Sequence, residues 1–322
     1  MYMKTYHDRL KELETYTGMG EKPADFTDYW KDALEELDRI NPDVSLQKAE
    51  FQGTHTECFH LYFTGVNGSR IHAQYLRPKN ISHPIPALLQ FHGYRWNAGD
   101  WCEKMAYTDM GFAIASMDCR GQGGLSEDLG SVRGTTVTGH VIRGITDTKE
   151  KLLYRQIFLD TALLARILMR FEEIDAEKLG VFGTSQGGGL AIACAALTPE
   201  IKKAAPCSPF LSDYQGACCH QECQGAYLEL WDYFRILDPC HEQEQDFFRQ
   251  LQYIDIRNLA PWVKADVLWG IGLEDKACPP STQFAAYNAL TSAKKMIVYP
   301  EYGHEPLPGF QDKMMQFMAE LL

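Results

Sequence analysis

The sequence lacks several features that mark common classes of protein. No stretch approaches the 18 apolar residues that a membrane-spanning helix needs. The opening stretch "MYMKTYHDRLKELETYTG" carries charges in every turn and has no apolar core, so we expect no secretory signal and a cytoplasmic protein. Basic residues are outnumbered, with 31 Lys and Arg against 43 Asp and Glu, and the net charge is −12. Because an acidic surface repels phosphate, nucleic-acid and anionic-membrane partners are disfavoured.

Cysteine is plentiful, but its spacing is not that of a metal site. Several cysteines lie within apolar runs such as "LAIACAAL", so we expect free thiols that pack as small hydrophobic side chains. The cluster "CCHQEC" at 218–223 has no paired C-x-x-C spacing, and Cys218 and Cys219 would point in different directions on a helix. We therefore predict no metal and no cofactor, and the role of Cys223 and its two neighbours stays open. The ten cysteines are Cys58, Cys102, Cys119, Cys194, Cys207, Cys218, Cys219, Cys223, Cys240 and Cys278.

Internal repeats, low-complexity tracts and Pro/Ser-rich linkers are also missing, so we expect a single domain over residues 1–322. Residues 25–40 carry apolar side chains at helical spacing, which predicts an amphipathic helix within an N-terminal helical extension, 1–45. Residues 58–78 alternate between apolar and polar on both sides of an Asn-Gly dipeptide. That pattern is a strong signal for an antiparallel hairpin.

After residue 80 short apolar runs alternate with helical patterns. Such alternation predicts an α/β protein with a mostly parallel sheet and helices on both faces. Residues 209–262, rich in Tyr, Trp and Gln, interrupt the alternation and are expected to form a helical insert or cap. In such sheets the functional residues lie beyond the C-terminal strand ends. The expected strands are 86–93, 112–118, 178–183, 202–209, 265–272 and 294–300. The expected helices are 152–171, 188–197, 281–290 and 310–322.

The stretch "GVFGTSQGGG" at 180–189 places a serine in a G-x-S-x-G pattern between a strand and a helix. This arrangement is typical of a nucleophile elbow, in which Gly183 and Gly187 let strand and helix approach closely around a strained Ser185. A phosphate-binding loop is the alternative, but neither G-K-[ST] nor G-x-G-x-x-G is present here. We therefore predict that Ser185 is a nucleophile.

A serine nucleophile needs a histidine base that a carboxylate orients, in the chain order Ser, acid, His. His220 and His241 lie in the insert, where a surface position is expected. His304, in "YPEYGHEP", follows the last expected strand, so we predict that it is the base. The acid is Glu274 or Asp275, which stand side by side after the preceding strand, and the spacing does not separate them.

An oxyanion hole requires two backbone N–H groups. One is expected from Gln186, which follows the nucleophile, and the other from Tyr94 in "LLQFHGYRWNAGDW". His92 in the same loop is expected to be a structural, hydrogen-bonded histidine.

The segments "FHGY", "GDW", "RGQGG", "GTSQGG", "GLEDKACPPSTQFAAYN" and "YGHE" together resemble the acetyl xylan esterase / cephalosporin C deacetylase family, carbohydrate esterase family seven. The resemblance runs from about residue 20 to the C-terminus. It implies an α/β-hydrolase fold and a Ser185–Asp275–His304 triad, which selects Asp275 over Glu274. It also implies an oxyanion hole formed by the N–H groups of Tyr94 and Gln186.

The resemblance further implies the roles of other residues and the assembly. Arg120, Gly121 and Gln122 match the RGQ motif of the family and are expected to brace the loops around the substrate pocket. A homo-oligomer, specifically a hexamer with its sites facing a central cavity, is implied as well. The stretch "CCHQECQGAY" departs from the family pattern and leaves the choice of substrate open.

The function implied is that of a serine esterase acting through an acyl-enzyme. It would remove acetyl groups from small O-acetylated substrates, such as acetylated xylo-oligosaccharides, other sugars or cephalosporin C. A serine peptidase of the prolyl-oligopeptidase type shares the motif order, but the chain ahead of Ser185 is too short for its propeller domain. A non-catalytic binding protein would have a broken triad, whereas every expected position is filled.

Overall fold

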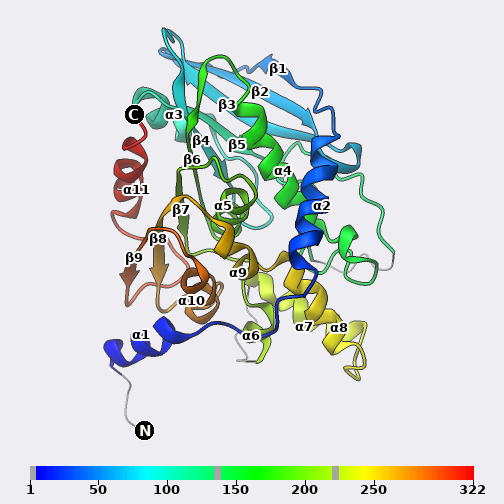
Figure 1. The fold of residues 1–322 in the computed structure, drawn as a ribbon. Coiled ribbons are helices and arrows are strands. Elements are labelled where there is room, and N and C mark those ends of the chain that lie inside the picture. Colours follow the sequence, from blue (N-terminus) through cyan, green and yellow to red (C-terminus); the bar gives the residue numbers. More distant parts are fainter. Residues whose placement is uncertain (1–4, 134–138, 220–224) are drawn as a thin grey trace.

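A nine-stranded sheet forms the centre of the computed structural model, which describes residues 5–133, 139–219 and 225–322 (Figure 1). The strand order is β1-β2-β3-β5-β4-β6-β7-β8-β9. The strands are β1 (Ser45–Lys48), β2 (Thr56–Thr64), β3 (Arg70–Pro78), β4 (Ile85–Phe91), β5 (Ala113–Met117), β6 (Ile174–Thr184), β7 (Lys203–Cys207), β8 (Asp266–Gly272) and β9 (Lys294–Tyr299). The α-helices are α1 (Tyr6–Thr15), α2 (Phe26–Asp38), α3 (Met105–Asp109), α4 (Leu153–Leu168), α5 (Gln186–Leu197), α6 (Tyr214–Cys219), α7 (Leu228–Ile236), α8 (Glu244–Leu251), α9 (Ile256–Leu259), α10 (Pro280–Ala289) and α11 (Phe310–Ala319).

The sheet is antiparallel at one end and parallel over the rest. Strands β1, β2, β3 and β5 pair antiparallel, whereas β5, β4, β6, β7, β8 and β9 pair parallel in that spatial order. The predicted hairpin is confirmed, since Thr64 pairs with Arg70 and the pairing continues to Thr56 opposite Pro78. The predicted parallel strands are confirmed as well. Sequence reasoning missed β1, a short edge strand whose residues are mostly exposed and carry no alternating pattern.

Helices cover both faces of the sheet, as predicted. The larger core lies between the sheet and a layer that includes α2, α4 and α5, and Ala87, Leu89 and Phe91 of β4 point into it. Leu88 of the same strand points to the other face, where it belongs to a smaller core with Tyr107 of α3 and residues of α11. Because β4 is buried on both faces, it reads as a continuous apolar run.

The carboxyl ends of the parallel strands meet at one edge of the sheet. Helices α6, α7 and α8 of the segment between β7 and β8 lie beyond this edge (Figure 1). The loops that follow β4, β6, β8 and β9 open at the same edge, and they carry the predicted site residues. The topology therefore gathers residues that are up to about 200 positions apart in the sequence.

The N-terminal segment is tied to the body of the protein by hydrogen bonds. Asp213 accepts the Tyr16 hydroxyl at 2.8 Å and the Met19 N–H at 2.7 Å. Arg257 donates to the Thr17 carbonyl at 3.0 Å, and Arg9 donates to the Leu273 carbonyl at 2.8 Å. These contacts hold α1 beside the loop that follows β8.

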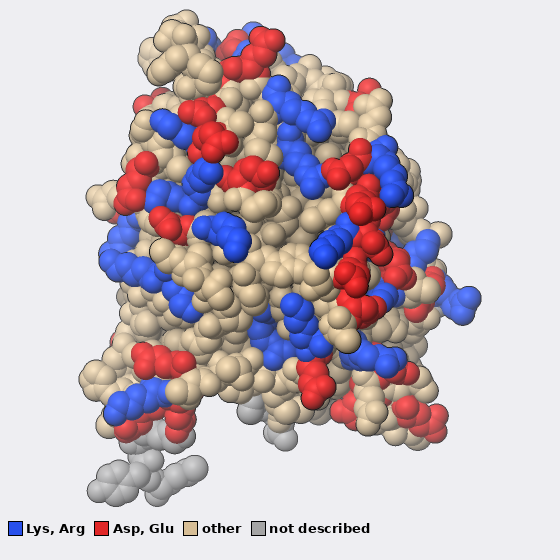
Figure 2. Space-filling view, in the orientation of Figure 1, with Lys and Arg blue, Asp and Glu red and all other residues tan. Residues whose placement is uncertain are grey.

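Charged side chains of both signs lie next to one another over most of the face shown in Figure 2. Several form ion pairs that join separate elements, such as Arg166 with Asp38 at 2.7 Å and Arg155 with Glu36 at 2.8 Å. Within the described ranges, no helix has both the length and the apolar character needed to cross a bilayer.

Candidate active site

Ser185 lies on a sharp turn between β6 and α5, with a backbone φ of 59° and ψ of −123°. A positive φ is unfavourable for a residue with a side chain, so the turn is strained and must be held by its surroundings. The Ser185 N–H donates to the Cys207 carbonyl at 2.9 Å, and the Ser185 carbonyl accepts the Phe210 N–H at 2.9 Å. The loop after β7 therefore fixes the serine from both sides of its peptide backbone.

The two glycines around the serine are required by close backbone approach. A Cβ atom on Gly187 would lie 1.9 Å from the Phe91 carbonyl oxygen, and one on Gly183 would lie 2.5 Å from Gly187 itself. Neither position can hold a larger residue without moving the backbone. Strand β6 and helix α5 thus meet as a nucleophile elbow requires.

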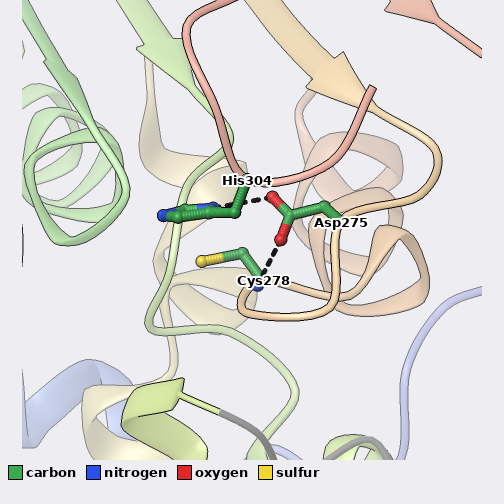
Figure 3. A group of neighbouring side chains, drawn as sticks. All are labelled: Asp275, Cys278 and His304. Atoms are coloured by element: carbon green, nitrogen blue, oxygen red, sulfur yellow. Dashed lines mark hydrogen bonds and ion pairs between the residues drawn. The ribbon is translucent and has the colours of Figure 1, made fainter. Parts of the chain in front are cut away.

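His304 and Asp275 form a hydrogen-bonded pair in the loops after β9 and β8. His304 Nδ1 lies 2.8 Å from Asp275 Oδ2 (Figure 3). The Asp275 side chain is fully buried, whereas the His304 side chain is 29% exposed. An ionised carboxylate only accepts hydrogen bonds, so this contact assigns the proton to Nδ1 and leaves Nε2 as the basic nitrogen.

The other Asp275 oxygen is held by its own loop. Oδ1 accepts the backbone N–H groups of Ala277 at 2.9 Å and Cys278 at 2.8 Å. Glu274, the other candidate acid, points away: its side chain is 51% exposed and pairs with Arg9 at 2.5 Å. Of the two adjacent carboxylates, the structure therefore brings only Asp275 to the histidine.

The Ser185 hydroxyl contacts a buried thiol that sequence reasoning did not single out. Ser185 Oγ lies 3.9 Å from Cys278 Sγ. Among the hydrogen bonds of the described residues, none joins Ser185 directly to His304, although both line the same cleft of about 630 Å³. The signal in the sequence was the turn "DKAC", in which Asp275 binds the backbone of a residue three positions later.

The two expected oxyanion donors flank the serine. Gln186 is the first residue of α5, where backbone N–H groups have no acceptor within the helix. Tyr94 lies in the loop after β4 and lines the cleft together with Ser185. Within the described part of the chain, neither of these N–H groups donates to a protein acceptor. The positive end of α5 also faces the cleft at this point.

Hydrogen bonds of two glutamine side chains, the partly buried Gln122 and the buried Gln186, tie these two donors to each other. The Gln122 amide nitrogen donates to Gln186 Oε1 at 2.8 Å, and Gln122 Oε1 accepts the Arg95 N–H at 2.8 Å. The Tyr154 hydroxyl donates to the same Gln186 oxygen at 2.6 Å, and the Gln186 amide nitrogen donates to the His92 carbonyl at 3.2 Å. Gln122 is therefore placed to set the spacing between the loop after β4 and the elbow.

Arg120 and His92 are structural in this arrangement. Arg120 is fully buried and forms a bidentate pair with Asp160 of α4, with both N–O distances at 2.7 Å. His92 accepts the Cys119 N–H on Nε2 at 2.9 Å, and its Nδ1 lies 2.7 Å from the Gly93 carbonyl. Burial lowers the pKa of His92, which agrees with a neutral ring that donates once and accepts once.

Three metal-binding donor types meet at the histidine. One donor atom each from Asp275, Cys278 and His304 lies within 4.8 Å of the other two (Figure 3). The carboxylate and Nδ1 are bonded to each other, and burial raises the pKa of the Cys278 thiol well above its ordinary value. The group is therefore arranged as an acid–base pair beside a neutral thiol. His220 and Cys223 lie outside the described residues, and His241 lies on the surface beside Glu244.

A family model and two solved structures that this chain resembles are all described as acetyl xylan esterases. The sequence model of the family described as acetyl xylan esterase (AXE1) matches residues 3–321. The crystal structure of acetyl xylan esterase 1 from Thermoanaerobacterium sp. JW/SL YS485 is 51% identical, covers 97% of this chain and 98% of that chain, and superposes with a TM-score of 0.95. An acetyl xylan esterase from Paenibacillus sp. R4 is 34% identical, covers 97% and 99% of the two chains, and gives a TM-score of 0.93.

A curated relative, the acetyl esterase Axe7A of Xylanibacter ruminicola, is 24% identical over 300 residues. The match covers 91% of this chain and spans 65% of the length of that relative. The resemblance found in the sequence motifs is therefore confirmed over nearly the whole chain, and so is the α/β-hydrolase fold that it implied.

Proposed function

The chain belongs to the acetyl xylan esterase (AXE1) family, and from this premise we propose that it is a serine esterase that removes acetyl groups from small O-acetylated substrates. The observation that carries the proposal is the convergence, in one cleft, of a serine on a strained elbow, an Asp–His pair and two backbone N–H groups that have no acceptor among the described residues. Each part supplies one requirement of acyl transfer, namely a nucleophile, a base and an oxyanion site.

The reaction follows from the positions of these groups. His304 Nε2 takes the proton of the Ser185 hydroxyl as Oγ attacks the acetyl carbonyl carbon, while Asp275 holds the imidazole through Nδ1. The Tyr94 and Gln186 N–H groups bind the resulting oxyanion. The alcohol leaves with the proton from His304, and an acetyl group remains on Ser185. Water, deprotonated by the same histidine, then releases acetate and restores the serine.

The acetylated alcohol is proposed from the family. The candidates are acetylated xylo-oligosaccharides, other acetylated sugars and the acetyl group of cephalosporin C, and the cleft that would receive them has a volume of about 630 Å³. The serine peptidase alternative is not favoured, because the family match and both close structures are acetyl xylan esterases. We also propose that the protein is cytoplasmic and forms a homo-oligomer, a hexamer by family resemblance. Light scattering of the purified protein would test the oligomeric state.

A panel of substrates tests the proposed function. Turnover is measured on p-nitrophenyl esters from acetate to octanoate, and on acetylated xylobiose and cephalosporin C. A pocket built for acetyl loses rate steeply with each added methylene, because the extra atoms displace the carbonyl from the oxyanion donors. Equal or rising rates toward octanoate would contradict an acetyl esterase.

A further inference from the structure

Glu229 is a buried carboxylate close to the proposed site, and the mechanism above does not use it. It lies on α7 and is only 4% exposed. Its Oε1 accepts the Tyr94 hydroxyl from the loop after β4, and its Oε2 accepts the Ile142 N–H at 2.9 Å. One side chain thus joins three segments that are distant in the sequence.

The surroundings of Glu229 fit an ionised carboxylate. Each carboxylate oxygen accepts a hydrogen bond, one from the Tyr94 O–H and the other from the Ile142 N–H. The oxygen of the Tyr94 hydroxyl in turn accepts the His140 N–H at 2.9 Å. The hydrogen bonds therefore run in one direction, from His140 through Tyr94 to the carboxylate. Gly139 allows this close approach, because a Cβ there would lie 2.1 Å from Glu229 Oε2.

Tyr94 is consequently held at two ends. Its peptide loop is fixed by the Arg95 N–H, which donates to Gln122, and by the Gly123 N–H, which donates to the Trp96 carbonyl at 3.0 Å. Its side chain is fixed by Glu229 and by edge contacts with the rings of Phe210 and His140. The direction of the Tyr94 backbone N–H depends on both anchors, since the ring and the peptide share one Cα.

We propose that Glu229 is a positioning residue, which fixes the Tyr94 side chain and thereby aims the Tyr94 backbone N–H at the oxyanion of the tetrahedral intermediate. The inference rests on the proposed function, because this aim matters only if Tyr94 stabilises an oxyanion. On this proposal α7 contributes to catalysis indirectly, because its residue Glu229 is one of the two anchors that hold Tyr94.

The charge state of Glu229 gives the proposal a pH signature. Burial raises the pKa of Glu229 to about 7. Protonation turns one carboxylate oxygen into an O–H donor that faces groups which already donate, so the hydrogen bonds that hold the Tyr94 hydroxyl and the Ile142 N–H are weakened. The titratable and charged groups around the carboxyl, from every element packed against it, are Tyr94 and Arg95 of the β4 loop, His140 of the 139–142 segment, Tyr154 of α4 and Tyr214 of α6.

Glu229 is the member of this group that changes charge near neutral pH. Burial lowers the pKa of His140 to about 4, and burial raises the pKa of Tyr94, Tyr154 and Tyr214. Arginine stays charged throughout. We therefore expect part of the acid-side loss of kcat to follow the protonation of Glu229.

The test compares E229Q, E229A, Y94F and the double variant Y94F/E229A on p-nitrophenyl acetate, with E242Q as the matched control. Glu242 lies exposed in the same segment between β7 and β8. Loss of one oxyanion donor costs about 10²–10³ in kcat, so a donor that is present but poorly aimed should cost about tenfold in E229Q and about 100-fold in E229A, with KM within about twofold. The double variant should match E229A rather than multiply the two losses, because both changes remove the same contact.

The pH profile separates positioning from a merely structural role. In the unmodified protein and in E242Q, part of the fall in kcat toward low pH should titrate near pH 7. In E229Q this part of the pH dependence should be absent. Variants that melt earlier but keep the kcat and the pH profile of the unmodified protein would overturn the inference, as would multiplicative losses in the double variant. If E229A does not fold, Y94F carries the test, because it removes only the hydroxyl. S185A distinguishes a failure of the proposed function from a failure of the inference about Glu229. Activity retained in S185A overturns the proposed function. An inactive S185A together with Glu229 variants of unchanged activity overturns only the inference about Glu229.

Discussion

Asp275 accepts a hydrogen bond from His304 Nδ1 at 2.8 Å, although the two residues lie in different loops and are 29 positions apart. The Asp275 carboxylate is buried, and its other oxygen accepts two backbone N–H groups. Asp275 therefore has little freedom to turn away from His304. The histidine is therefore held in the tautomer that presents a basic Nε2 to the cleft.

We predict that D275N loses about four orders of magnitude in kcat, because an Asn amide can donate to Nδ1 and favour the wrong tautomer. The matched control is E274Q, at the adjacent carboxylate that is half exposed and bonded to Arg9. The control should stay within about twofold, as is usual for exposed positions outside the site. Steady-state kinetics on p-nitrophenyl acetate checks both variants. Similar losses in the two would contradict the assignment of the acid.

The bridge between Gln122 and Gln186 predicts a second kinetic effect. Q122A removes the contacts that fix the spacing between the Tyr94 loop and the elbow, at 2.8 Å on each side. We expect kcat to fall by about tenfold with little change in KM, since misaimed oxyanion donors weaken the transition state more than the ground state. Q245A, at an exposed position of the segment before β8, is the control. A rise in KM at constant kcat would instead indicate a role in substrate binding.

The donors of Asp275, Cys278 and His304 predict inhibition by soft divalent cations. Thiolate and imidazole are preferred ligands of Zn²⁺ and Cd²⁺, and binding would displace the thiol proton and occupy His304, the proposed base. We expect Zn²⁺ to inhibit, EDTA to restore the rate, and C278A to raise the inhibitory concentration by about tenfold or more, each variant being compared with its own metal-free rate. C240S, at an exposed cysteine, should leave the inhibitory concentration unchanged. Equal sensitivity in C278A would show that the ion binds elsewhere.

Asp255 predicts a pH dependence of stability. Burial raises the pKa of Asp255 to about 7 in the folded protein, whereas an unfolded Asp titrates near 4. The folded state therefore binds more protons between these values, and this residue destabilises the fold as pH rises from about 4 to about 7. Urea unfolding of the unmodified protein and D255N at pH 5 and pH 8 checks the sign. The free energy of unfolding should fall less between the two pH values in D255N, and an equal or larger fall would contradict the assignment.

Much of the fold could be predicted because its signals are local. The apolar runs of the parallel strands, the Asn-Gly hairpin and the glycines around Ser185 each act within a few residues. Strand β1 could not be predicted, because an exposed edge strand of four residues has no pattern of burial. A helical extension was expected over residues 1–45, but the bounds of α1 within it were not, since no residue of this helix is buried and its charges mask the helical period.

The site divides in the same way. The order along the chain and the places after strands were enough to nominate Ser185 and His304, whereas Asp275 was preferred over Glu274 only through the family resemblance. Cys278 and Glu229 were missed because their roles depend on contacts made in three dimensions, over 93 and 135 positions. No short motif surrounds Glu229, and its partner Tyr94 was considered only for its backbone. The turn "DKAC" was a local signal for Cys278, whereas the long-range contact of Glu229 with Tyr94 leaves no period or spacing in the sequence.

We propose that Ser185 is the nucleophile of an acetyl esterase. This assignment is tested by kcat/KM of purified S185A on p-nitrophenyl acetate, with circular dichroism to show that the variant is folded. We expect a loss of about 10⁴-fold or more, because the remaining groups only bind and polarise the ester. A folded S185A that retains a rate within about tenfold of the unmodified protein would contradict it.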